Sequence, residues 1–132
     1  MNDTPAALNT LLTHFKDTGR KSSDYDAIFT GDLGHIGKEI LAELSKLKGY
    51  NIKSNYNDCG VLIFDKDSQD THSGGSGCGC IATVFSGYIF NQLKNKKYKR
   101  VLLIATGALT NATTAQQGES IPGIAHAVSI EI

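Results

Sequence analysis

The feature that most constrains this chain is a continuous apolar run, Val-Leu-Leu-Ile-Ala, which follows Arg100 and ends at Ala105. Such a run is typical of a β-strand that is covered on both faces. A shorter run at residues 26–30, Asp-Ala-Ile-Phe-Thr, carries branched and aromatic side chains and also predicts a buried strand. Strands covered on both sides need helices above and below them, so the sequence favours a layered α/β/α domain with a mixed sheet.

Three segments have the apolar spacing of amphipathic helices, which would supply those outer layers. Thr4 and Pro5 suit the start of the first helix, and Gly19 and Gly49 are placed to end the first and second. We expect the apolar stripe of each helix to face the sheet. The stripe positions are Leu8, Leu11, Leu12 and Phe15 in the first segment, Ile36, Ile40, Leu41, Leu44 and Leu47 in the second, and Cys78, Ile81, Ala82, Phe85, Ile89 and Leu93 in the third.

The remaining segments complete the predicted order helix, strand, helix, strand, helix, strand, strand. Residues 55–60 have turn chemistry, and residues 61–64 predict a short strand. Residues 107–122 are read as a polar loop, and residues 123–132 alternate as a strand does. In that strand Ile124, His126, Val128, Ile130 and Ile132 lie on one side. No repeat or linker interrupts the pattern, so we expect residues 1–132 to form a single unit.

The overall charge is balanced, with 13 lysines and arginines against 13 aspartates and glutamates. This balance gives no general attraction to nucleic acid or to anionic lipid. The basic stretch at residues 94–100 is interpreted as a solvated helix end and turn rather than a nucleic-acid site, because cations suit the C-terminal end of a helix. We expect no transmembrane segment and no signal peptide, since neither pattern occurs.

The cysteines and histidines do not form a complete catalytic or metal-binding set. Cys59, Cys78 and Cys80 are odd in number, which favours reduced thiols in a cytosol-like compartment over a disulfide framework. Cys78 and Cys80 lie near a helix start, where thiol pKa is lowered in principle, but no histidine has a diagnostic spacing from them. His126 is read as a core histidine. We therefore expect no metal and no cofactor.

Three strand-to-helix or strand-end junctions carry small residues at positions where open α/β sheets bind ligands. They are residues 30–35, residues 74–80 and residues 106–109. Glycines at such turns let backbone amides approach an anion, and a helix start adds partial positive charge. The alternative is that these glycines only allow helices to pack closely on the sheet. The candidate ligand-binding residues are Gly31, Asp32, Gly75, Ser76, Gly77, Thr106 and Gly107.

Two aspartates near these junctions have more than one interpretation. Asp32 follows a predicted strand directly, and its carboxylate either caps the next helix or contacts a ligand. Asp58 lies in the predicted turn, where capping or turn stabilisation is favoured over an acid–base role.

Five sequence strings together resemble the C-terminal part of the stage V sporulation protein AD family. They are DYDAIFTGDL, YNDCGVLIFD, GGSGCGC, RVLLIATGAL and QQGESIPGIAHAV. That family is similar to thiolases and ketoacyl-ACP synthase III, which have two related α/β halves. The resemblance implies that this chain is a thiolase-like second half, in which the first strand of a five-stranded mixed sheet is missing.

The resemblance also implies a function, namely binding of dipicolinic acid for its uptake into the developing spore. In condensing enzymes the nucleophilic cysteine belongs to the first half. Gly31 stands where their histidine would be, and the string from Gly75 to Cys78, with Ser76 nearest, stands where their asparagine would be. The leading hypothesis is therefore a non-catalytic acid-binding pocket. The alternatives are an acyltransferase or condensing enzyme that takes its cysteine from an N-terminal half, and a fragment that folds only on a partner.

The implied partners are dipicolinic acid, an N-terminal thiolase-like half, a second copy of the chain, and membrane proteins of the stage V sporulation A operon. The implied location is the cytoplasmic face of the forespore or spore inner membrane.

Overall fold

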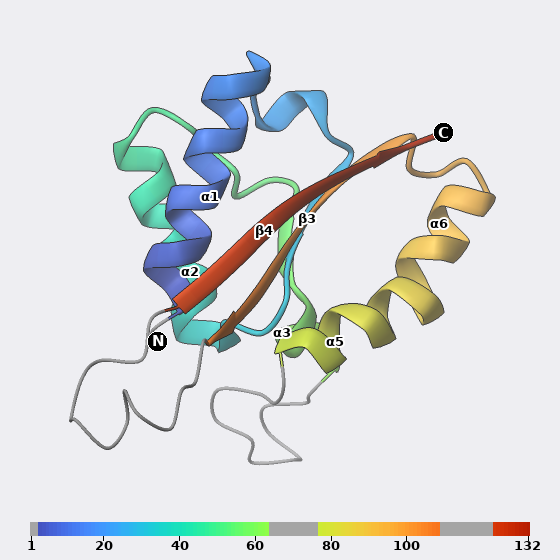
Figure 1. Cartoon of the computed structure of the whole chain (residues 1–132). Coiled ribbons are helices and arrows are strands. Elements are labelled where there is room, and N and C mark those ends of the chain that lie inside the picture. The colour runs from blue at the N-terminus through green and yellow to red at the C-terminus, as the bar shows by residue number, and fades with distance from the viewer. Residues whose placement is uncertain (1–2, 64–76, 109–122) are drawn as a thin grey trace.

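The central sheet is mixed and has four strands in the order β2-β1-β3-β4 (Figure 1). Strands β1, β2 and β3 are mutually parallel, and β4 runs antiparallel to β3 along the whole of its length. This computed structural model describes residues 3–63, 77–108 and 123–132. The strand bounds are Ala27–Thr30 for β1, Tyr56–Asp58 for β2, Arg100–Ala108 for β3 and Gly123–Glu131 for β4.

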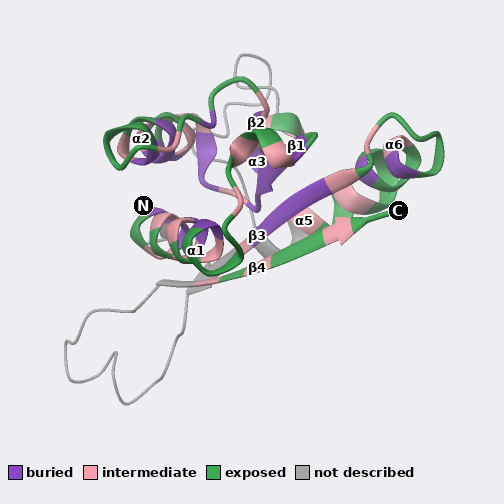
Figure 2. Ribbon diagram, turned by 90° about the horizontal axis from the view of Figure 1, so that it is seen from above, coloured by how far each residue is buried: buried purple, intermediate pink, exposed green. Residues whose placement is uncertain are grey.

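Helices cover both faces of the sheet, as the two buried apolar runs predict (Figure 2). On one face α1 and α2 enclose a core that includes Phe15, Leu41 and Leu102. On the other face the helix that begins with α5 packs against Phe29, Val101 and Leu103. The layered mixed α/β fold is therefore confirmed. The helix bounds are Asp3–Thr18 for α1, Gly34–Leu47 for α2, Cys59–Ile63 for α3, Gly77–Val84 for α5, Phe85–Ile89 for the π-helical turn η2 and Phe90–Lys94 for α6, with a 3-10 turn η1 at Ser22–Asp24.

The first two helices end where the sequence predicts. Gly19 has a φ of 68° and Gly49 a φ of 95°, a left-handed conformation that glycine adopts without a steric penalty. Thr4 lies inside the first turn of α1 rather than before it, and its buried hydroxyl faces Gly37 of α2. A Cβ atom at Gly37 would lie 3.1 Å from that hydroxyl oxygen, so a glycine here lets α1 and α2 pack closely.

The prediction for residues 55–64 is wrong. The expected turn holds strand β2, and most of the expected strand at residues 61–64 is the short helix α3. Tyr56 and Asp58 are buried although the segment is polar in sequence. Its polar side chains are satisfied by hydrogen bonds to neighbouring elements, and this compensation cannot be read from local composition.

Two helix faces also differ from their predicted stripes. Ile36 and Leu47 of α2 are 68% and 80% exposed, and the buried side of the helix uses small residues such as Gly37, Ala42 and Ser45 beside Leu41. Small residues allow α2 to approach α1, which turns the outer aliphatic positions toward solvent. In the third helix the π-helical turn η2 shifts the register, so Val84 is buried and Ala82 is exposed.

Strand β4 alternates as the sequence predicts, with Ile130 packed against the second core and the alanine side against the first. Helix α1 packs against Ala125 and Ala127, and the Thr10 hydroxyl donates to the Ala125 carbonyl over 3.1 Å. His126 is exposed, and Val128 is 50% exposed. The interpretation of His126 as a core histidine is therefore wrong, because β4 is an edge strand and its second face is only partly covered (Figure 2).

Candidate functional site

Two of the predicted ligand-binding residues, Gly31 and Asp32, follow the carboxyl end of a parallel strand. Gly31 and Asp32 come directly after β1, and Gly77 begins α5. Helix α5 contacts both α3 and β3, so these elements gather at one end of the sheet (Figure 1). Gly75 and Ser76 lie outside the described residues, as does most of the predicted loop at residues 107–122.

Thr106 and Gly107 are not in a turn after the strand, as the sequence suggested. Strand β3 continues to Ala108, so Thr106 pairs with Ala125 and Gly107 pairs with Ile124 of β4. Antiparallel pairing with β4 gives the backbone N–H and C=O groups of these residues hydrogen-bond partners, so β3 continues to Ala108. Of the seven candidates, the described backbone therefore places Gly31 and Asp32 between β1 and α2, Gly77 at the start of α5, and Thr106 and Gly107 inside the sheet.

The turn after β1 is held by its neighbours on both sides. The Gly31 amide donates to the Ile104 carbonyl over 3.1 Å, and the Gly31 carbonyl accepts from the Gly60 amide over 3.0 Å. The Asp32 carboxylate lies against Gly60, since a Cβ atom there would fall 1.9 Å from Asp32 Oδ1. The Gly31 amide is thus used within the fold, and any ligand at this turn must be recognised by other groups.

Asp58, at the end of β2, organises this end of the sheet. Its fully buried carboxylate accepts through Oδ1 from the Thr30 hydroxyl at 2.5 Å and from the Leu33 amide at 2.8 Å. Through Oδ2 it accepts from the Gly34 amide at 3.2 Å and from the Val61 amide at 3.3 Å. A carboxylate only accepts, so four donors match its two oxygens. The same side chain therefore joins β1, the start of α2 and the first turn of α3.

The buried network extends to Tyr56, whose hydroxyl lies 2.7 Å from the Thr30 hydroxyl. Because Thr30 gives its own proton to Asp58, Tyr56 is the donor in this pair. Burial raises the pKa of the Tyr56 hydroxyl well above its usual value, with the Asp58 charge adding to the effect. Tyr56 accordingly keeps the proton that completes the network.

Sequence reasoning found only part of this arrangement. The predicted local capping role of Asp58 is confirmed by its bond from the Val61 amide, but its second role, capping α2 from a neighbouring strand, was not predicted. Asp32 was a candidate cap for α2, but the N-cap residue is Leu33, whose side chain makes no capping hydrogen bond. Thr30 and Tyr56 were missed, because their roles depend on strand pairing rather than on spacing along the chain.

Comparison with known protein families identifies the chain. The family model of stage V sporulation protein AD matches residues 2–131. The chain belongs to the stage V sporulation protein AD family. A protein of that name from Bacillus subtilis (strain 168) is 47% identical over 127 residues. The match covers 96% of this chain and 37% of the length of the relative. The family resemblance read from the five sequence strings is confirmed.

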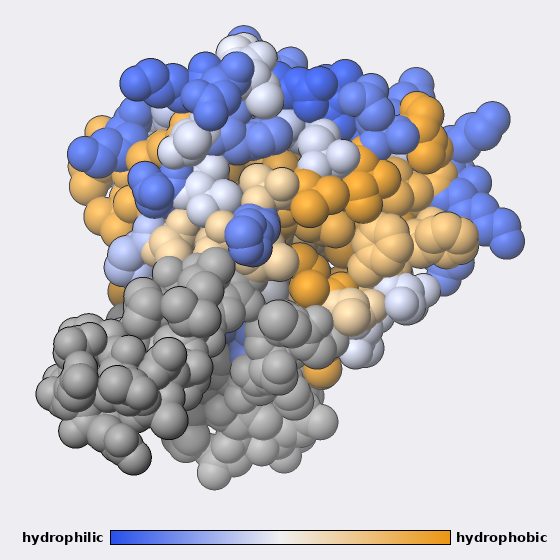
Figure 3. Space-filling view, in the orientation of Figure 1, coloured by the Kyte–Doolittle hydropathy of each residue, from blue (hydrophilic) through white to orange (hydrophobic). Residues whose placement is uncertain are grey.

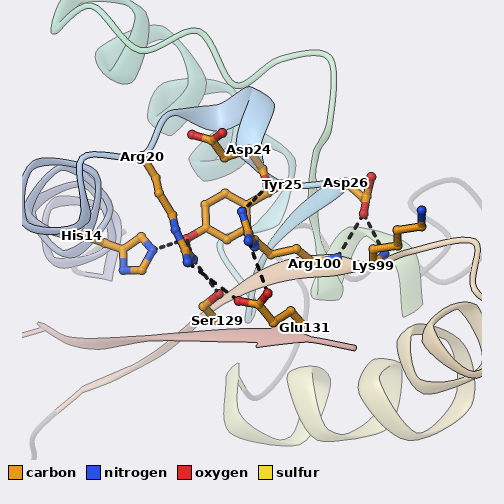
Figure 4. Close-up of polar contacts among 9 residues, drawn as sticks. All are labelled: His14, Arg20, Asp24, Tyr25, Asp26, Lys99, Arg100, Ser129 and Glu131. Atoms are coloured by element: carbon orange, nitrogen blue, oxygen red, sulfur yellow. Dashed lines mark hydrogen bonds and ion pairs between the residues drawn. The ribbon is translucent and has the colours of Figure 1, made fainter.

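This stage V sporulation protein AD family member has a second polar cluster at the opposite, amino end of the parallel strands (Figure 4). Arg100 and Arg20 both reach Glu131, at 3.2 Å and 3.7 Å. Arg20 also donates to the Tyr25 hydroxyl at 3.2 Å, and that hydroxyl contacts His14. Partial burial, followed by the nearby Arg20 charge, lowers the pKa of His14.

Asp26, directly before β1, belongs to the same polar cluster of this family member. Its carboxylate accepts from the backbone amides of Lys99 at 2.7 Å and Arg100 at 3.0 Å (Figure 4). These amides hold the pKa of Asp26 below its usual range. The carboxylate thereby fixes the connection from α6 into β3.

In the part of the chain that the structure describes, neither end of the sheet of this family member brings together the residues of a cofactor site. Residues 3–63, 77–108 and 123–132 contain no group of three or more His, Cys, Asp or Glu side chains that would hold a metal ion. Cys59 is buried, and the backbone places Cys78 and Cys80 in the first half of α5. No helix among these residues is long and apolar enough to cross a membrane.

Proposed function

We propose that this domain helps to bind dipicolinic acid as the non-catalytic, thiolase-like second half of a stage V sporulation protein AD. The observation that carries the proposal is the family match over residues 2–131 at 47% identity to a named member. Because the chain spans 37% of that relative, the ligand, the N-terminal half, a second copy and the operon's membrane proteins as partners are all part of the proposal.

Dipicolinic acid is a flat pyridine ring with two carboxylates, so its pocket needs donors set a fixed distance apart. The start of α5 at Gly77 offers backbone amides and the positive end of a helix that continues without interruption to Lys94. Asp32 lies against Gly60 of α3, a helix that contacts α5, and a carboxylate so placed would repel a second anion. We therefore assign the acid-binding role to the segment from Gly75 to Gly77, with Asp32 at its border.

Chemistry of the acyl-transfer kind is not part of this proposal, because Gly31 carries no side chain to act as a base. The Asp58 network leaves the β1 junction rigid rather than reactive, since its donors are already paired. A pocket kept without a reaction is consistent with that arrangement. We also propose the cytoplasmic face of the spore inner membrane as the location.

The test is isothermal titration calorimetry with dipicolinate, run on this chain and on the full-length Bacillus subtilis relative. Ser76→Asp places a negative charge in the proposed pocket and should abolish the binding heat. Ser86→Asp makes the same change at an exposed position farther along the helix and should leave the heat unchanged. Benzene-1,3-dicarboxylate, which lacks the ring nitrogen, tests ligand specificity.

Loss of heat in the Ser76 variant alone would support the proposal. No heat in either wild-type protein, or equal heat in both variants, would contradict it. Turnover of an acyl-coenzyme A by the full-length protein would also contradict it and would favour a condensing enzyme.

A further inference from the structure

The balanced overall charge conceals a strong separation of charge along the molecule. Eleven of the 13 lysines and arginines lie in three short segments, residues 16–21, 46–53 and 94–100. These segments contain or follow the C-terminal ends of α1, α2 and α6, and each precedes a parallel strand. They therefore meet at the amino end of the sheet, opposite the Asp58 network. Hydrophilic side chains cover this upper end of the molecule in Figure 3.

The carboxylates at this basic end do not cancel its charge. There are five of them, which leaves a surplus of six positive charges, and most are already engaged. Glu131 pairs with Arg20 and Arg100, and Glu43 pairs with Lys53. The five carboxylates are those of Asp17, Asp24, Asp26, Glu43 and Glu131. Eight lysines remain exposed and outside the ion pairs that described residues form, namely Lys16, Lys21, Lys46, Lys48, Lys94, Lys96, Lys97 and Lys99.

Lys96 occupies a conformation that does not suit a lysine. Its φ is 61°, and it follows the end of α6 much as Gly19 and Gly49 follow α1 and α2. A residue with a Cβ atom costs about 1 kcal/mol or more in this left-handed region. The chain thus has glycine at two of the three helix ends and a strained lysine at the third. That difference indicates a role for the charge itself.

The exposed side chain of Leu47 indicates which kind of anionic partner fits this basic end. Its side chain is 80% exposed and lies between Lys46 and Lys48 in sequence. Nucleic acid offers only base edges and phosphates to an isolated exposed aliphatic side chain. A lipid bilayer offers an apolar layer just below its charged head groups. An exposed leucine flanked by lysines therefore fits a membrane surface better than a nucleic acid.

We propose that this basic end docks the domain on an anionic lipid bilayer. The three segments come from separate connections at one end of the sheet, so their lysines are spread over that end. The lysines would lie among the lipid phosphates, and Leu47 would enter the interfacial layer. This inference rests on the membrane location in the proposed function, and it goes further by naming the surface and the lipid chemistry.

The experiment is co-sedimentation of the full chain with vesicles. Binding to vesicles of phosphatidylcholine mixed with phosphatidylglycerol is expected, with little binding to phosphatidylcholine alone and a steep loss as salt is added. Replacing Lys94, Lys97 and Lys99 together with Gln should weaken partitioning about 100-fold, because each lysine near an anionic surface contributes about fivefold.

Helix α2 supplies a matched control for each kind of contact. Lys48→Gln should weaken partitioning about fivefold, whereas Lys38→Gln, near the other end of the same helix, should have no effect. Leu47→Ser should also weaken it severalfold, whereas Ile36→Ser should not, although Ile36 is 68% exposed. A thermal melt of each variant shows whether it is folded.

Absence of binding to anionic vesicles would overturn the inference, as would equal effects of Lys38→Gln and Lys48→Gln. Tighter binding to a DNA duplex, unaffected by Leu47→Ser, would overturn it in favour of nucleic acid. The dipicolinate titration is independent of these measurements. Loss of vesicle binding with retained dipicolinate heat would refute only this inference, and the reverse result would refute only the acid-binding proposal.

Discussion

Replacement of Asp58 with Asn should destabilise the fold far more than the similar shape of the two side chains suggests. Asparagine offers one accepting oxygen and one donating nitrogen where aspartate offers two accepting oxygens. Oδ1 accepts from Thr30 and Leu33, and Oδ2 accepts from Gly34 and Val61. Whichever position the amide nitrogen takes, two donors will face another donor in a site that is fully buried.

The size of the effect follows from those two orphaned donors. Each buried donor without a partner costs about 1–3 kcal/mol, so two of them should cost the variant about 2–6 kcal/mol. A loss of that size is a large share of the roughly 5–15 kcal/mol that stabilises a typical domain. For a chain of 132 residues it should lower the melting temperature by about 10 °C.

Urea unfolding followed by circular dichroism measures the free energy directly, and Asp26→Asn is the matched control. The Asp26 carboxylate also accepts two backbone amides, but it is exposed, so water can replace what the substitution removes. We expect the control to lose less than about 1 kcal/mol. Equal losses in the two variants, or an Asp58→Asn protein as stable as the wild type, would refute the reasoning about buried donors.

The remaining predictions concern single residues. Gly60→Ala should cost about 1–3 kcal/mol in urea unfolding, because its Cβ would fall 1.9 Å from Asp32 Oδ1. Lys96→Gly should raise the free energy of unfolding by about 1 kcal/mol, by relieving a φ of 61°. Burial raises the pKa of Tyr98 to about 12, so stability should be complete below about pH 10 and fall as pH rises toward 12, and Tyr98→Phe should reduce that fall. The lowered pKa of Asp26 stabilises the fold above about pH 4 and loses this effect in acid, so the stability difference between wild type and Asp26→Asn should disappear there.

The elements that sequence predicted well are those whose burial follows a simple period. The run ending at Ala105 and the helix stripe from Leu8 to Phe15 were both predicted correctly, because the strand is covered by apolar cores on both faces and the helix packs through one apolar side. Strand β2 was not predicted, for the opposite reason. Its buried side chains are polar, and the hydrogen bonds that make Asp58 tolerable inside the protein come from residues 24 to 28 positions away or from a following helix.

The position of the β1 junction was predictable from the sequence, but its hydrogen bonds were not. The junction at Gly31 lies where parallel strands end, and this follows from the α/β order alone. The bond from the Gly31 amide to the Ile104 carbonyl depends on how β1 pairs with β3, and the place of Thr106 within the sheet depends on how far β3 pairs with β4. Strand pairing length is set by tertiary packing, so a single sequence does not encode it locally.

Lys96 gives the sharpest test of whether the two ends of this domain have separate tasks. A purely structural lysine would be retained because it stabilises the fold, yet at a φ of 61° glycine is the better residue. The Lys96→Gly variant should therefore gain about 1 kcal/mol in urea unfolding and at the same time lose about fivefold in binding to anionic vesicles. Asp58→Asn should do the reverse, losing stability while its folded fraction binds vesicles normally, because Asp58 lies at the opposite end of the same strands. Opposite signs of the two effects in Lys96→Gly would separate function from stability, since damage to the fold cannot raise one and lower the other. A variant that gained stability with unchanged vesicle binding would show that the strained lysine has no part in docking.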